Sequence, residues 1–193
     1  MHVKKPWVRA AVGTLAFAIL ALAVVAPGVL AAASASATQN VTVTIPQRVG
    51  IKLNPSSITI DLTNQNYPPD TFPAYYGTSS APAVVVSVFA NSPAGFTVTV
   101  TASGNPPTWL PFTDWYVAAG TNPGDATPAR TAEGETPDTM WKALSTSQTI
   151  IDKTNEKTAG WDDYNVDFQL KFNGDEEATT ISGVTLTYTI TAK

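Results

Sequence analysis

Apolar and polar residues alternate along most of the chain after residue 38. The alternating runs are VTVTI at 41–45, ITIDL at 58–62, FTVTVT at 96–101, VDFQLKF at 166–172 and VTLTYTI at 184–190. A period of two puts the apolar side chains on one face of a strand and the polar ones on the other, so each run predicts a half-buried antiparallel strand. The run AVVVSVFA at 83–90 is apolar on both faces, which predicts a central strand.

Turn-forming residues separate these runs. Asn-Ser-Pro-Ala-Gly at 91–95 predicts a tight hairpin loop, Asn-Pro-Ser at 54–56 predicts a break, and Asn-Gly-Asp at 173–175 starts the connection between the last two strands. Helical periodicity is limited to one turn at 140–144. The pattern predicts an all-β domain at 38–193, a single antiparallel β-sandwich of immunoglobulin-like or pilin-like kind.

The stretch 103–146 interrupts this alternation. It contains the pair Pro106-Pro107, further Pro residues and three of the five Trp residues of the chain. Since Pro cannot donate a hydrogen bond to a strand ladder, we expect a long irregular excursion out of the sandwich.

Residues 1–37 have the order of a secretory signal peptide. Basic residues without acids occupy 2–9, an uncharged apolar stretch occupies 10–25, and small residues lead to Ala35-Ser36-Ala37. This order predicts export with cleavage after Ala37 or after Ala35. The competing interpretation is an uncleaved membrane anchor, which needs ~20 apolar residues. A Pro-Gly break at 27–28 and the small residues favour cleavage, which leaves no permanent membrane span.

The composition excludes several kinds of catalytic and metal-binding site. The chain has no Cys, which excludes disulfides, Cys-ligated metal sites and thiol nucleophiles. Its one His is His2, inside the predicted signal, so the exported form would lack an imidazole for a catalytic triad or a metal. The formal net charge of −4 becomes more negative without the basic signal, and acidic proteins repel phosphate backbones. We expect no enzymatic activity, no cofactor and no nucleic-acid partner.

Two sets of side chains are candidates for ligand binding. Exposed aromatic rings stack on sugar faces, although such rings more often fill a core. The aromatic candidates are Trp109, Trp115, Tyr116, Trp141 and Trp161. Carboxylates gather at 162–167 and 175–177 and are of the type that binds Ca²⁺, but the spacing of a dedicated calcium loop is missing. Solvated surface is the favoured interpretation for these acidic residues, and no metal site is predicted.

The segment Gln39–Ile45 is the strongest candidate for a subunit interface. After signal cleavage it would be a strand-forming peptide near the chain end, with Val41, Val43 and Ile45 as alternate apolar side chains and Pro46 after it. Such a strand either begins its own sandwich or fills a sheet edge of a neighbouring subunit, where backbone hydrogen bonds give affinity and pockets give register. Repeated head to tail, the second arrangement makes a fibre. The sequence leaves both alternatives open.

Three stretches carry a resemblance to known proteins. They are VVVSVFANSPAGFTVTVTAS at 84–103, WKALSTSQTII at 141–151, and YNVDFQLKF with GVTLTYTIT within 164–191. These stretches resemble exported β-sandwich surface proteins of bacteria and archaea, a loose group with spore-coat-U-like, WxL-type, TasA-like and donor-strand pilin members. The chain has neither Trp-x-Leu repeats nor the Cys pairs of chaperone–usher pilins, so no single member is indicated. The resemblance implies a non-catalytic extracellular subunit that polymerises by donated strands.

These observations lead to two hypotheses from different classes. The first is a secreted structural subunit of a cell-surface filament, pilus or extracellular matrix, a homo-polymer that assembles through the strand at 38–46. The second is an extracellular carbohydrate-binding module that uses its Trp residues to bind a polysaccharide. The first is favoured because strand exchange requires neither Cys nor catalytic groups, and this chain offers neither.

Overall fold

A computed structural model of the protein describes residues 37–193. Residues 1–36 of the predicted signal peptide, which include the alternative cleavage site after Ala35, lie outside the described residues. Within residues 37–193 the only helix is η1 (Phe112–Asp114), a single 3-10 turn. None of the described helices is therefore long and apolar enough to cross a membrane.

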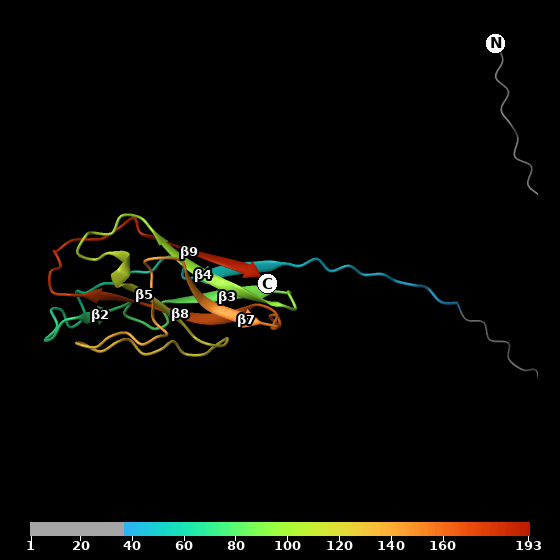
Figure 1. Cartoon of the computed structure of the whole chain (residues 1–193), viewed down its shortest axis with the longest axis horizontal. Helices are drawn as coiled ribbons and strands as arrows, with labels where there is room; N and C mark the ends of the chain where they lie inside the picture. Colours follow the sequence, from blue (N-terminus) through green and yellow to red (C-terminus); the bar gives the residue numbers. More distant parts are fainter. Residues whose placement is uncertain (1–36) are drawn as a thin grey trace, which may run out of the picture. The chain divides into compact units, whose positions relative to one another are not determined.

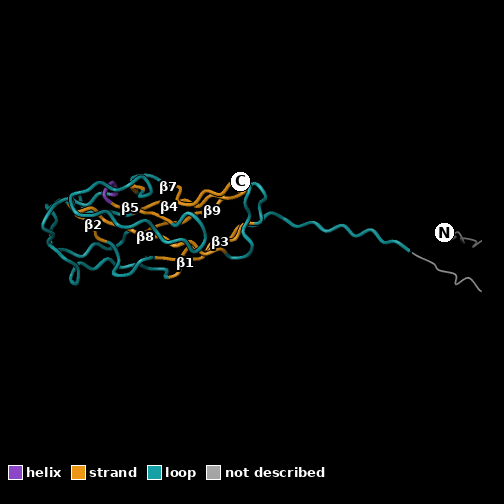
Figure 2. The backbone as a smooth tube through the Cα atoms, turned by 90° about the horizontal axis from the view of Figure 1, so that it is seen from below, coloured by secondary structure: helices purple, strands orange, loops and turns teal. Residues whose placement is uncertain are grey.

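Strands β1 to β9 form two antiparallel sheets that lie on top of each other (Figures 1 and 2). Sheet A has the order β1 (Val49–Asn54), β3 (Val84–Ala90), β8 (Asp162–Phe172), β5 (Trp115–Ala119) and β6 (Lys142–Ala143), and β2 (Ala74–Tyr76) pairs with the last residues of β8. Sheet B has the order β7 (Gln148–Thr154), β4 (Gly95–Ser103) and β9 (Thr185–Ala192). The fold is all-β and has the arrangement of a β-sandwich, as the alternating sequence predicts.

The core lies between the two sheets and is made by the apolar face of each strand. Its buried residues come from both layers, and they include Val86, Val88, Phe96, Val98, Val100, Val117, Leu144, Ile151, Tyr164 and Val166. A second apolar cluster joins β2 and the end of β8 to Leu110. The apolar residues predicted to face inward in 96–101 and 166–172 are buried, and the central position predicted for 83–90 is confirmed by the two neighbours of β3.

The turn at 91–95 joins two strands, but it does not form the hairpin that the sequence predicted. It leads from β3 in sheet A to β4 in sheet B, so it crosses from one layer to the other. Gly95 ends the turn with a φ of +104°, a conformation in which a Cβ atom would lie 2.0 Å from the carbonyl oxygen of Lys153. Turn residues mark where the chain reverses, but they do not reveal whether the strands on either side pair with each other.

The run at 58–62 is not a strand, contrary to the prediction. Ile58, Ile60 and Leu62 pack half-buried against the two apolar clusters, yet their backbone joins no ladder. The edge of β3 that such a strand could occupy is taken by β1, with Leu53 opposite Val86. A period of two therefore identified an apolar face correctly without identifying a hydrogen-bonded strand.

The stretch 103–146 is only partly the irregular excursion that the sequence predicted. It contains η1 and β6, and its strand β5 pairs along the middle of β8, with Val117 opposite Phe168. The prediction missed β5 because its run WYVAA is short and has Pro residues and loops on both sides. The segment between β5 and β6 is irregular, and it packs on the outer face of sheet A through the contacts described below.

Candidate functional site

The segment before β1 has the exposure of an unpaired peptide. Residues 37–48 belong to no strand. Val41, Val43 and Ile45 are 75%, 75% and 78% exposed, which is far above the other apolar residues of the described chain. In the structure this segment does not form a first strand of its own sandwich. Its donation to a neighbouring subunit stays a prediction.

Asn91 fixes the point at which this segment leaves the sandwich. Its side-chain Nδ2 donates to the carbonyl oxygen of Pro46 at 2.9 Å, and its Oδ1 accepts from the backbone N–H of Arg48 at 2.6 Å. The backbone N–H of Asn91 also donates to the carbonyl oxygen of Arg48 at 3.2 Å. Gln47 adds a hydrogen bond to the carbonyl oxygen of Lys193 at the end of the chain. The sequence predicted a turn at Asn91 but gave no indication of this role.

Strand β9 leaves one edge of sheet B open. The N–H of Lys193 donates to the carbonyl oxygen of Gly95, which extends the β4–β9 ladder past Ala192. In an antiparallel ladder the backbone groups of alternate residues point to the same side. The groups of Leu186, Tyr188 and Ile190 therefore point away from β4, and the described residues provide no hydrogen-bond partner for them.

The outer face of sheet B is a ladder of hydroxyl side chains. In the register of β4 with β9, Thr97 lies opposite Thr191, Thr99 opposite Thr189, and Thr101 opposite Thr187. The four Thr side chains of β9 are exposed, whereas the apolar residues between them are half-buried. The outward position of Thr and the inward position of the apolar residues in 184–190 were predicted and are confirmed.

Four of the five aromatic candidates are buried or half-buried. Trp109, Trp115 and Tyr116 are half-buried, and Trp141 is buried with 5% of its surface exposed. Trp115 and Tyr116 pack against other aromatic rings, those of Phe112 and Tyr75 respectively. Trp141 has a structural role, since its Nε1 donates to the carbonyl oxygen of Ala129.

Trp161 is the exception, with 47% of its surface exposed. Its ring packs against Phe89 of β3 and lies over Gly50 of β1. The Nζ of Lys52 is 3.8 Å from the ring centroid, a cation–π distance. The exposed ring therefore already has a cationic partner from its own chain.

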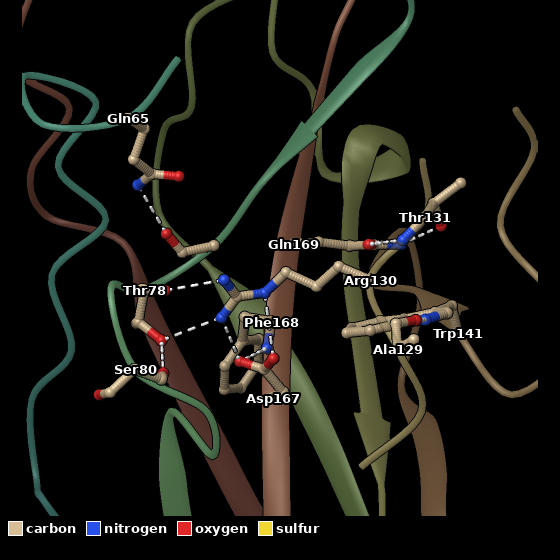
Figure 3. A network of polar contacts seen from close by, with 11 residues as sticks. Gln65, Thr78, Ser80, Ala129, Arg130, Thr131, Trp141, Asp167, Phe168 and Gln169 are labelled. Atoms are coloured by element: carbon tan, nitrogen blue, oxygen red, sulfur yellow. Dashed lines mark hydrogen bonds and ion pairs between the residues drawn. The ribbon is translucent and has the colours of Figure 1, made fainter. Parts of the chain in front are cut away.

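A polar network attaches the segment between β5 and β6 to the outer face of β8 (Figure 3). Arg130 reaches both carboxylate oxygens of Asp167, and its Nη1 donates to the carbonyl oxygen of Thr78 at 2.8 Å. Beside it, the amide of Gln169 accepts from the N–H of Thr131 and donates to the hydroxyl of the same residue. Asp167 and Gln169 are 1% and 0% exposed, so the face that the sequence predicted to be polar is also largely covered.

The acidic residues do not assemble into a metal centre. Among residues 37–193, no three Asp, Glu or His side chains lie close enough together to hold a metal ion. Asp167 is paired with Arg130, and Glu176 accepts hydrogen bonds from the backbone N–H groups of Asn173 and Gly174 in the turn after β8. Burial and the nearby carboxylates of Glu156 and Asp163 raise the pKa of Asp162.

Comparison with known proteins assigns no family to this arrangement. No protein-family model matches the chain, and no curated protein matches it significantly. Support for a function therefore comes from the geometry of residues 37–193.

Proposed function

We propose that the chain is a secreted structural subunit of a cell-surface filament, pilus or extracellular matrix that assembles by β-strand complementation. The sandwich in this proposal is of the immunoglobulin-like or pilin-like kind. The observation that supports it most is the exposure of Val41, Val43 and Ile45 in a segment that belongs to no strand. The resemblance of three sequence stretches to exported surface proteins agrees with it.

The free energy of assembly has an identifiable source. Burying a Val or Ile side chain that is otherwise exposed contributes about 1.5–3 kcal/mol, and the segment carries three of them. Backbone hydrogen bonds to a sheet edge contribute about 1 kcal/mol each after exchange with water. These gains oppose the loss of translational and rotational freedom on association. An exposed alternating segment without a partner would also be prone to aggregate, because unpaired strands recruit other chains.

The carbohydrate-binding alternative has weaker support. Only Trp161 of the five aromatic candidates is exposed, and Lys52 lies over its ring. A broad polysaccharide panel monitored by Trp fluorescence would test it, since a saturable change lost in Trp161→Ala would favour sugar binding over the structural role.

The structural role is tested by comparing Val43→Asp with Thr42→Asp in the exported protein. Both place the same charge on the same exposed segment. In a complemented strand the side chain of residue 43 would face the partner's core, whereas that of residue 42 would face solvent. Because burying a charge is costly, we expect Val43→Asp to lower the fraction of sedimentable polymer at least about tenfold and Thr42→Asp to leave it nearly unchanged.

The thermal unfolding midpoint of the monomer serves as the control, because both residues are exposed in the single chain. Neither substitution should change it. Deletion of residues 38–46 should abolish filaments in negative-stain micrographs. Filaments of normal length from Val43→Asp or from the deletion would contradict the proposed function.

A further inference from the structure

The side of the sandwich between β1 and β9 is incompletely covered. The inward-facing residues of β4, Val98 and Val100, are 0% exposed because strands pair with both edges of β4. On the neighbouring strand β9, the inward-facing Leu186, Tyr188 and Ile190 are only half-buried. The same holds for Ile51 and Leu53 of β1, and Val49 is 40% exposed. Two apolar rows therefore meet at a side of the molecule where the described chain supplies no further strand.

We infer that this side is the acceptor, and that residues 39–45 of a second copy of the chain pair with the open edge of β9. The inference rests on the proposed function and adds the partner surface to it. The backbone groups of Leu186, Tyr188 and Ile190 point to this edge and lack partners among the described residues. Their side chains, together with Ile51 and Leu53, form the apolar surface against which a donated strand packs.

The donor segment and the acceptor strand have the same alternation of Thr and apolar residues. Residues 39–45 read QNVTVTI, and β9 reads TLTYTITA, so both alternate Thr with larger apolar residues. With Val41, Val43 and Ile45 turned inward, Thr42 and Thr44 lie on the outer face beside the Thr residues of β9. The ladder of Thr97, Thr99 and Thr101 opposite β9 is then extended by one more strand, and cross-strand Thr pairs favour such pairing.

The other edge of sheet B is a poorer acceptor. Its strand β7 carries Lys153, whose side chain is buried to 9% exposure and whose Nζ donates to Oδ1 of Asn122 at 2.9 Å. An inward-pointing charge on an edge strand discourages the addition of another strand. The inward side chains of an apolar donor beside β7 would pack next to this ammonium group.

Disulfide mapping in the full exported chain tests the inference, because the natural sequence contains no Cys to interfere. Thr42→Cys is combined in turn with Thr185→Cys, Thr187→Cys and Thr189→Cys, three exposed positions along β9. Thr42→Cys with Thr149→Cys, an exposed position on β7, is the matched control. After mild oxidation of assembled protein, we expect at least one β9 pair to give a ladder of covalent oligomers on non-reducing gels, and the β7 pair to give at least tenfold less.

The outcomes separate the acceptor from the proposed function. A ladder from the β7 pair alone, or filaments without any β9 ladder, would overturn the β9 acceptor while leaving strand complementation standing. A β9 cross-link confined to single chains would mean that the segment pairs within its own subunit, which overturns both. Absence of filaments and of ladders in every variant and in the natural chain would also overturn both.

Discussion

Arg130 and Asp167 form a two-pronged ion pair on the outer face of sheet A. The Nη2 of Arg130 lies 3.0 Å from Oδ1 of Asp167, and its Nε lies 3.1 Å from Oδ2. Asp167 is 1% exposed, and its Oδ1 also accepts a hydrogen bond from the N–H of Phe168. The pair connects the loop between β5 and β6 to the middle of β8, so its removal should affect the whole sandwich.

Arg130→Met should lower the free energy of unfolding by about 2–3 kcal/mol. Breaking a buried ion pair costs about 3–5 kcal/mol because one charge stays buried without a partner, and the partial exposure of Arg130 reduces this cost. Urea unfolding measures the change. The double variant Arg130→Met with Asp167→Asn should recover part of the loss. A loss of unfolding free energy in the double variant that exceeds the sum of the losses in the two single variants would contradict this explanation.

Gly95→Ala should destabilise the protein by about 1–3 kcal/mol. The φ of Gly95 is +104°, which side chains rarely adopt, and the added methyl group would meet the backbone of Lys153. Gly160→Ala is the control, because Gly160 has open space around it and no such φ. Thermal unfolding of both variants compares them, and equal midpoints would show that the layer-crossing turn tolerates a side chain.

Leu144→Ala should lower the free energy of unfolding by about 2–5 kcal/mol, because it leaves a cavity between the sheets. Leu144 is 1% exposed in the main core. Val43→Ala removes apolar atoms from a side chain that is 75% exposed, so it should leave monomer stability within about 0.5 kcal/mol. Urea unfolding of the monomer tests both, and a large effect of Val43→Ala would mean that residue 43 packs within its own chain.

Stability should fall at alkaline pH through Tyr164. Burial, with smaller contributions from Asp162 and Glu156, raises the pKa of Tyr164 from 10.0 to about 12. As the pH rises from 10 to 12, the unfolded chain releases this proton first, so the free energy of unfolding decreases. Below pH 10 the full contribution of Tyr164 to the free energy of unfolding is present. Two pKa units at about 1.36 kcal/mol each set an upper limit of ~3 kcal/mol on this loss, and solvent screening reduces the expected value to about 1–2 kcal/mol.

Urea unfolding of the natural chain and of Tyr164→Phe at about pH 9 and about pH 11.5 measures this contribution. The variant should lose less stability over this interval, although a decrease remains because burial also raises the pKa of Tyr188. The same decrease in both proteins would assign the alkaline effect to other groups.

The sequence predicted which face of a strand is apolar better than it predicted which strands pair with each other. The inward residues of 96–101, 166–172 and 184–190 are where the period of two places them. The same period predicted a strand at 58–62, where the structure has half-buried apolar side chains but no ladder. Periodicity depends on the side chains of one segment, whereas a ladder depends on a second segment that is distant in sequence.

The candidate interface stays a prediction, and only part of its basis is visible in the sequence. Val41, Val43 and Ile45 were identified from their spacing, but their exposure in the single chain and the open edge of β9 required the sheet order. The T-x-T patterns shared by 41–45 and 184–190 are the sequence signal for the pairing proposed above. Asn91, by contrast, gave no such signal. An Asn in a turn cannot be distinguished by sequence from an Asn whose side chain also binds the backbone of Pro46.

The sequence by itself determined the all-β class, the apolar face of most strands and the absence of Cys chemistry, because these follow from residue type and local spacing. The tertiary structure decided that the turn at 91–95 crosses between layers and that Asp167 and Gln169 are covered. It also decided that no strand among residues 37–193 pairs with the outer edge of β9. Each of these depends on which distant strands share hydrogen bonds, and that choice is made by the packing of the whole core rather than by any single segment.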